Sequence, residues 1–227
     1  MPRESFDQEL QRLQDAVLAL GSRVESAIVD SVKSLKERDT EASKNIVAQD
    51  RLINEKRFEL EAEALALIAT QQPMARDLRI IAAVLDIASE LERIGDYAKG
   101  IARIHLMIGG QPFIKPLIHL PAMAARASDM LHESLEAFAR GDAALARVIP
   151  EEDDEVDALY NRVYRELLDL IIEDGSRIDQ ANYLLWAAHN LERSADRVTN
   201  ICERVIFTVT GEMVEMDMED SGVESIG

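Results

Sequence analysis

The chain of 227 residues contains an internal repeat, and this repeat restricts the folds that it can adopt. The run Leu91–Asp96 reads LERIGD, and one hundred residues later Leu191–Asp196 reads LERSAD. Earlier in each half the match holds at an offset of 103 residues, as at Asp39 and Asp142, Asp50 and Asp153, and Ile53 and Val156. The offset changes within a turn, where a length difference of three residues is easily absorbed. The sequence therefore predicts two similar units of about 105 residues each.

Apolar residues at steps of three and four predict that each unit consists of three long helices. The clearest pattern comprises Phe6, Leu10, Leu13, Val17, Leu20, Val24, Ile28, Val32 and Leu35. Similar patterns predict helices over about 41–69, 73–108, 121–140, 143–173 and 179–210. Glycines and prolines within 109–116 mark the boundary between the units. We expect an all-α fold of six long antiparallel helices in two tandem, pseudo-symmetric three-helix bundles, residues 1–110 and 111–210, followed by a loose acidic tail at 211–227.

Charge limits the partners that such a chain can have. There are 25 basic and 43 acidic residues, which gives a net charge of −18. A surface this negative repels phosphate backbones and anionic lipids, so we expect no nucleic-acid partner and favour cations or basic protein faces. The apolar runs are too short for membrane insertion, and the first residues lack an apolar signal region, so a cytoplasmic location is expected. Cys202 is the only cysteine and is expected to pack in the core.

The repeated run holds an acidic pair in each half, Glu92 with Asp96 and Glu192 with Asp196. Residues four apart on a helix lie on one face, with about 5–6 Å between their Cβ atoms. The apolar stripe of this helix is centred roughly 150° away, so the pair faces outward or into a groove. A hard cation would turn the repulsion between two carboxylates into a binding site. The alternative is a solvated surface on which the arginine three positions before each aspartate forms a salt bridge.

The second helix of each half adds a further polar pair, Asp50 with Asn54 and Asp153 with Asp157. If the second and third helices pack antiparallel, both pairs can reach one groove. We therefore expect two carboxylate-lined metal sites, one formed by Asp50, Asn54, Glu92 and Asp96 and the other by Asp153, Asp157, Glu192 and Asp196. The alternative is that Asp50 and Asp153, which lie near the edge of the apolar stripe, make polar contacts between helices.

The sequence offers little support for catalysis. A di-metal oxygen-activating bundle uses a Glu-x-x-His motif, and none of the four histidines follows a glutamate by three positions. There is no Gly-x-Ser-x-Gly elbow and no glycine-rich loop for phosphates. A metalloenzyme on a helical bundle is therefore disfavoured, and a pure scaffold whose acids only keep it in solution stays open.

The combination of two tandem three-helix units, each with Leu-Glu-Arg-x-x-Asp on its third helix, resembles the PhoU family of bacterial phosphate-uptake regulators. The similarity is carried by Gln71–Arg79, Leu91–Ala98 and Asn190–Glu203. It implies a cytoplasmic, non-enzymatic protein that connects the phosphate ABC transporter, through its ATPase subunit, with the sensor histidine kinase of the phosphate regulon. Such a regulator keeps uptake and kinase signalling low when phosphate is plentiful. An accessory of a low-affinity phosphate permease is the closest alternative.

The resemblance also implies metal ions, as iron or zinc clusters in some members, bound by the Glu-x-x-x-Asp motifs. It adds Asn200 and Glu203 to the expected ligands of the second half. Gly100 stands at the position of Asn200, so the first half would have the smaller ligand set. Carboxylates leave the choice between iron, zinc, manganese and magnesium open. Exposed apolar faces on so acidic a protein suggest pairing into a homodimer.

Overall fold

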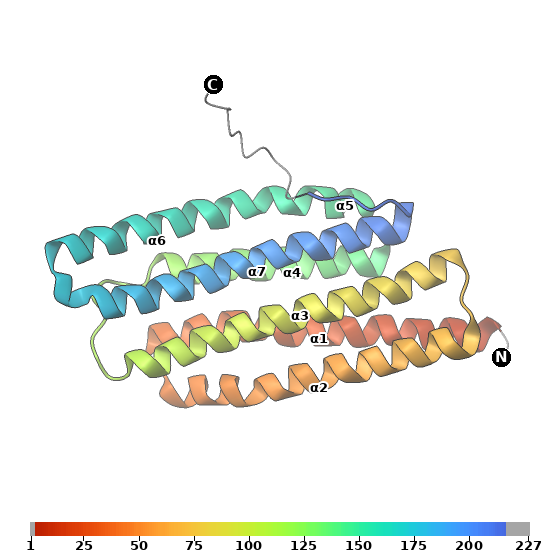
Figure 1. Ribbon diagram of the computed structural model, residues 1–227, viewed down its shortest axis with the longest axis horizontal. Helices are drawn as coiled ribbons and strands as arrows, with labels where there is room; N and C mark the ends of the chain where they lie inside the picture. The colour runs from red at the N-terminus through yellow and green to blue at the C-terminus, as the bar shows by residue number, and fades with distance from the viewer. Residues whose placement is uncertain (1–2, 217–227) are drawn as a thin grey trace, which may run out of the picture.

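The computed structural model describes residues 3–216, and all regular structure within this range is helical (Figure 1). In chain order the elements are α1 (Arg3–Glu37), α2 (Thr40–Gln71), α3 (Ala75–Ile108), α4 (His119–Arg140), α5 (Ala143–Val148), the 3-10 turn η1 (Ile149–Glu152), α6 (Asp153–Glu173), the 3-10 turn η2 (Gly175–Arg177) and α7 (Ile178–Thr210). The six long helices α1, α2, α3, α4, α6 and α7 confirm the all-α prediction. None of the helices in the described range is long and apolar enough to cross a membrane.

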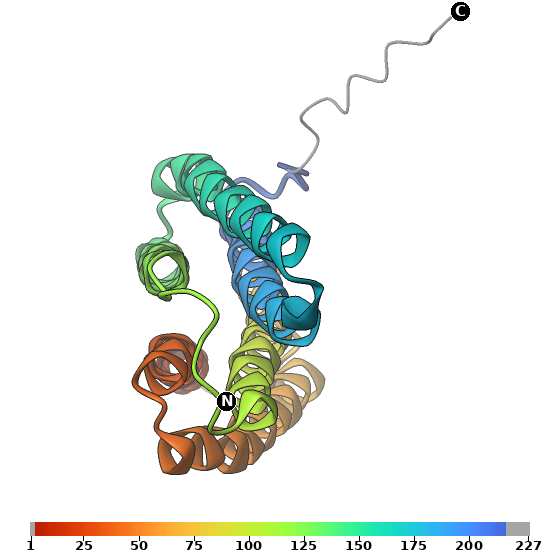
Figure 2. The same cartoon turned by 90° about the vertical axis from the view of Figure 1, so that its left-hand side faces the viewer.

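The helices are arranged as two similar groups of three that share one interface. Seen end-on, α3 and α7 pack together at the centre, α2 and α6 flank them, and α1 and α4 cover one face of this layer (Figure 2). The third helices of the two halves therefore contact each other directly, and so do the first helices. This shared interface brings the repeated acidic runs of α3 and α7 into neighbouring positions.

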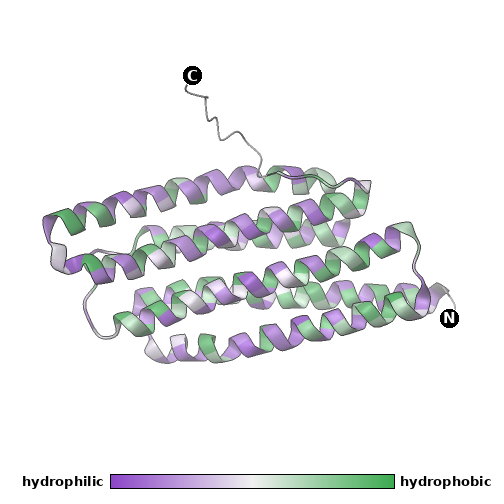
Figure 3. Cartoon of the chain, in the orientation of Figure 1, coloured by the Kyte–Doolittle hydropathy of each residue, from purple (hydrophilic) through white to green (hydrophobic). Residues whose placement is uncertain are grey.

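Hydrophobic and hydrophilic residues alternate along each long helix, as the 3.6-residue period requires (Figure 3). In α1 the predicted apolar stripe is buried over its whole length, with every member at most 7% exposed. In α3 the buried stripe includes Val84, Ile87, Leu91, Ile94 and Ala98, which leaves the face carrying Glu92 and Asp96 outside the core.

Several helix ends are set by local chemistry. The side chain of Asp39 accepts a hydrogen bond from Ala42 N at 2.9 Å and caps α2. Gly141 ends α4 in the left-handed conformation, with φ 63°, and the side chain of Asp142 caps α5.

The fifth predicted helix is not continuous. Where one helix was expected over 143–173, the structure has α5, then the turn η1, then α6. Pro150 lies within η1; it has no backbone N–H to donate, and its ring clashes with the carbonyl four residues earlier in a continuous α-helix. Asp153 consequently lies at the first residue of α6 rather than in the middle of a long helix.

The linker between the halves is held by side chains from both of them. Arg38 donates to Gly110 O and Gln111 O, at 2.5 and 2.7 Å. On the other side, Gln180 accepts from Ile114 N at 2.6 Å and donates to Pro112 O at 3.0 Å. These contacts fix the path between α3 and α4, which a glycine- and proline-rich segment would not fix alone.

Residues 211–216, expected as part of a loose tail, instead lie against α7. Met216 N donates to Glu203 Oε1 at 2.9 Å, and Val214 and Met216 pack on the core. The rest of the predicted acidic tail, 217–227, lies outside the described residues.

Candidate metal sites

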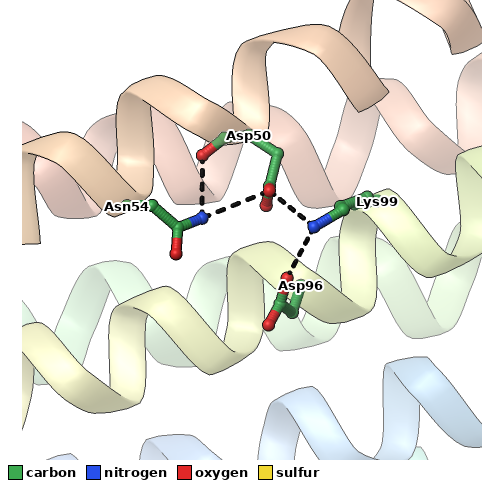
Figure 4. A network of polar contacts seen from close by, with 4 residues as sticks. All are labelled: Asp50, Asn54, Asp96 and Lys99. Carbon is green, nitrogen blue, oxygen red and sulfur yellow. Dashed lines mark hydrogen bonds and ion pairs between the residues drawn. The ribbon is translucent and has the colours of Figure 1, made fainter.

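In the first half, Asp50 of α2 and Asp96 of α3 are joined by a lysine (Figure 4). Lys99 Nζ lies 2.6 Å from Asp50 Oδ2 and 3.0 Å from Asp96 Oδ1. The Asp50 side chain is only 7% exposed, that of Lys99 20% and that of Asp96 47%. The site therefore runs from a buried carboxylate to an exposed one, with an ammonium between them.

Neighbouring groups complete this arrangement. Asn54 Nδ2 donates to Asp50 O and to Asp50 Oδ2, at 3.1 and 3.2 Å. Burial raises the pKa of Glu92, and the charge of Asp96 adds to the rise. Hydrogen bonding to Asp50 raises the pKa of Lys99, which keeps its ammonium protonated. Asp50, Asn54 and Asp96 thus lie together, and the charges of Asp96 and Asp50 act on Glu92, but the group surrounds a lysine that the sequence analysis did not include.

In the second half, Glu192 has a different environment. Its Oε2 atom is buried and accepts no hydrogen bond, although His189 Nδ1 lies 3.0 Å away, so the contact is an ion pair only when the histidine is protonated. Burial raises the pKa of Tyr160, and the Glu192 carboxylate raises it further. The Tyr160 and His189 rings are 6.1 Å apart between centroids. The sequence analysis predicted neither Tyr160 nor His189 at this site. The position of His189, three residues before Glu192 on the same helix, could have indicated their contact.

The remaining predicted ligands of the second half have different surroundings from one another. Asp157 is exposed, and burial and then the charge of Asp154 raise the pKa of Asp157. Asn200 Nδ2 donates to Glu90 Oε2 of α3 at 3.4 Å. Glu203 is buried under the tail, where it accepts from Met216 N. Asp153 and Asp196 lie at the start of α6 and in the middle of α7, and each makes an interaction of its own.

Arg193, in the repeated run of α7, and Arg197, just after it, contact residues of the first half. Arg193 Nε donates to Tyr97 Oη at 3.0 Å, and its guanidinium lies 5.5 Å from the centre of that ring. Arg197 Nη1 lies 3.4 Å from Glu90 Oε2. These contacts bind α7 to α3, and the sequence alone did not indicate that the two third helices face each other.

The donor chemistry fits a metal ion better in the second half than in the first. The second half has four carboxylates among its predicted core ligands, whereas the first has three. Both halves contain a buried carboxylate oxygen that accepts no hydrogen bond, such as Asp50 Oδ1 and Glu192 Oε2. In the first half a protein cation already bridges the two aspartates. Within residues 3–216 no three His, Cys, Asp or Glu side chains are gathered closely enough to hold a metal ion. Metal binding at these residues stays a prediction.

Cys202 adds no ligand to either site. The side chain is fully buried, and burial raises the pKa of its thiol to about 12. Because only a thiolate binds metals strongly, this residue packs in the core, as predicted.

Comparison with known proteins covers almost the whole chain. Residues 17–104 and 120–205 each match the PhoU domain. The chain is 34% identical over 218 residues to "Phosphate-specific transport system accessory protein PhoU homolog" of Clostridium acetobutylicum, covering 96% of this chain and all of the relative. It is 32% identical over 207 residues to "Phosphate-specific transport system accessory protein PhoU" of Escherichia coli K12, covering 91% and 86%.

Solved structures give the same result. The phosphate transport system regulatory protein PhoU from Streptococcus pneumoniae superposes with a TM-score of 0.86 at 30% identity, covering 93% of this chain and all of that one. PhoU from Pseudomonas aeruginosa also superposes with a TM-score of 0.86, at 32% identity, covering 91% of this chain and all of that one.

Proposed function

The chain belongs to the PhoU family, and we propose that it is a non-enzymatic regulator of phosphate uptake and of phosphate-regulon signalling. The observation that carries this proposal is the nearly full-length similarity to proteins named as accessories of the phosphate-specific transport system. Those names describe accessory proteins rather than enzymes.

The proposed partners are the ATPase subunit of the phosphate ABC transporter and the sensor histidine kinase. The regulator would connect the two and keep both uptake and kinase signalling low when phosphate is plentiful. A net charge of −18 supports docking to basic protein faces, because complementary charge accelerates encounter and selects partners. The rigid helical body presents this charge at fixed positions.

Metal ions are the proposed cofactors, with the second half as the better site. Glu192 and Asp196 would hold the ion, and Asp153 and Asp157 of α6 would complete its oxygen ligands. Such an ion would supply positive charge on an otherwise acidic face. The Oε2 atom of Glu192 supports this assignment, because it is buried and accepts no hydrogen bond, and His189 supplies a positive charge beside it only when protonated.

A cytoplasmic homodimer is the proposed state of the protein. Phe58, Ile172 and Trp186 are large apolar side chains that are 59, 82 and 54% exposed. Exposed apolar residues of this size are candidates for contact with a second copy.

Binding of purified partners tests the proposed adaptor role. The untagged protein should bind both the transporter's ATPase subunit and the kinase in calorimetric titrations with manganese present. The double variant Glu192→Gln/Asp196→Asn should contain less metal and bind its partners more weakly. Glu55→Gln/Glu59→Gln is the matched control, since that pair has the same spacing on α2 but already forms ion pairs with Arg51 and Lys56.

Absence of binding to both partners would contradict the adaptor role. Binding to a low-affinity phosphate permease instead would favour the alternative accessory function. Unchanged metal content in the Glu192→Gln/Asp196→Asn variant would refute the second-half site without affecting the adaptor role.

A further inference from the structure

We propose that Lys99 is the resident cation of the first half, so that metal binding is confined to the second half. Lys99 Nζ contacts one aspartate oxygen on α2 and one on α3, at 2.6 and 3.0 Å. A metal ion bridging Asp50 and Asp96 would compete with this ammonium for the same two carboxylates, although the second Asp50 oxygen, Oδ1, is buried and accepts no hydrogen bond. The ammonium is covalently tethered to α3, so it is always present at high effective concentration.

The burial of this contact makes it difficult for a metal to displace. The Asp50 side chain is only 7% exposed, so its charge requires a partner. Asn54 Nδ2 also donates to Asp50 Oδ2, which is the oxygen that contacts the lysine. An incoming ion would have to separate Lys99 from Asp50 and move the ammonium into solvent. Loss of the short Asp50 contact opposes that exchange.

The second half follows the same plan without the lysine. At the matching position, one hundred residues later, stands Thr199, which is uncharged and buried. Of the two arginines on this turn, Arg193 contacts Tyr97 and Arg197 contacts Glu90, both on α3. The residue equivalent to Lys99 is therefore uncharged in the second half.

The two halves also differ in the charges of their predicted core ligands. The first half combines three carboxylates, Asp50, Glu92 and Asp96, with one ammonium. The second has four carboxylates, Asp153, Asp157, Glu192 and Asp196, and no lysine at the equivalent place. The inference rests on the metal binding proposed above for the second half only. It assigns the first half a structural role that needs no metal.

Substitution of Lys99 by an uncharged residue tests this assignment. Lys99→Thr reproduces the residue of the second half, and Lys99→Met keeps most of the side-chain volume. Each variant should roughly double the manganese bound at saturation, measured by equilibrium dialysis and metal analysis. Lys99→Arg is the matched control, because it keeps the positive charge and should leave the manganese content at the wild-type level.

A second variant keeps the test decisive if the uncharged substitutions fail to fold. In the wild-type background, Glu192→Gln/Asp196→Asn should remove essentially all bound manganese, because the first half binds none. Half of the wild-type content remaining in that variant would overturn the inference and leave metal binding intact. The absence of manganese in both wild type and Lys99→Thr would refute the proposed metal binding and the inference together. Manganese in wild type with no gain in a folded Lys99→Thr would overturn the inference alone.

Discussion

At the scale of single residues, a buried histidine links three helices of the first half. His105 Nδ1 lies 2.6 Å from Ser43 Oγ, and Ser43 Oγ lies 2.9 Å from Ser34 Oγ. All three side chains are buried. Burial lowers the pKa of His105, and the charge of Arg38 lowers it further, while Asp39 acts in the opposite direction. Burial and Arg38 therefore favour the neutral imidazole in the folded protein.

This residue should make the protein acid-sensitive. Because the folded-state pKa lies below the unfolded value of about 6.5, its contribution to stability is complete above that pH. The contribution is lost as the pH falls through the folded-state pKa. Between about pH 7.5 and about pH 5.5, the urea midpoint of wild type should therefore decline more than that of His105→Gln.

His132→Gln provides the control for this experiment, because the side chain of His132 is 69% exposed. Its midpoint should follow wild type across the same range. Parallel decline of wild type and His105→Gln would show that the buried imidazole does not cause the acid sensitivity.

At the scale of elements, the contact between α1 and α4 depends on a glycine. A Cβ atom at Gly21 would lie 2.1 Å from Leu135 Cδ1, so the two helices approach closely there. Alanine normally stabilises a helix interior by about 1 kcal/mol relative to glycine. Overpacking of a buried contact costs about 1–3 kcal/mol. The steric term should prevail, and Gly21→Ala should lower the free energy of unfolding.

Gly175→Ala is a suitable comparison, because no atom lies within 4 Å of the Cβ position there. Its effect on the free energy of unfolding should be small. A double-mutant cycle with Leu135→Ala should show coupling to Gly21→Ala, since the smaller side chain leaves room for the added methyl group. Additive effects would indicate that the helices separate instead.

The helices themselves could be predicted because their signals are local. The apolar stripe of α1 and the caps at Asp39 and Gly141 each depend on residues close in sequence. The break at Pro150 was also a local signal, but the regular apolar pattern on either side concealed it.

The candidate sites were only partly predictable, because their details depend on how separate helices approach each other. Spacing placed Asp96 on an outward face, and the structure agrees. Spacing did not reveal that Lys99 reaches back to Asp50 on α2. The Arg197–Glu90 contact requires the packing of α3 on α7, which periodicity within one helix does not specify.

At the scale of the whole molecule, the two halves should unfold together. The α3–α7 and α1–α4 contacts join them, and Arg193 and Arg197 make polar contacts across the boundary. Leu60 is fully buried in α2, so Leu60→Ala should cost about 2–5 kcal/mol. The only tryptophan, Trp186, lies on α7 in the other half.

Trp186 fluorescence therefore reports whether destabilisation of the first half also destabilises the second. In Leu60→Ala, the fluorescence transition and the loss of helical circular dichroism should move together to lower urea concentration. A fluorescence transition that stays at the wild-type midpoint would show that the second half is stable independently of the first.

The two halves share one design, and we propose that they differ in the cation that they hold: the Lys99 ammonium in the first half and a metal ion in the second. A crystal grown with manganese and measured at the manganese absorption edge tests this most directly. We predict anomalous density from manganese beside Glu192 and Asp196, with Lys99 still placed between Asp50 and Asp96. Anomalous density between Asp50 and Asp96, with Lys99 turned away, would contradict it.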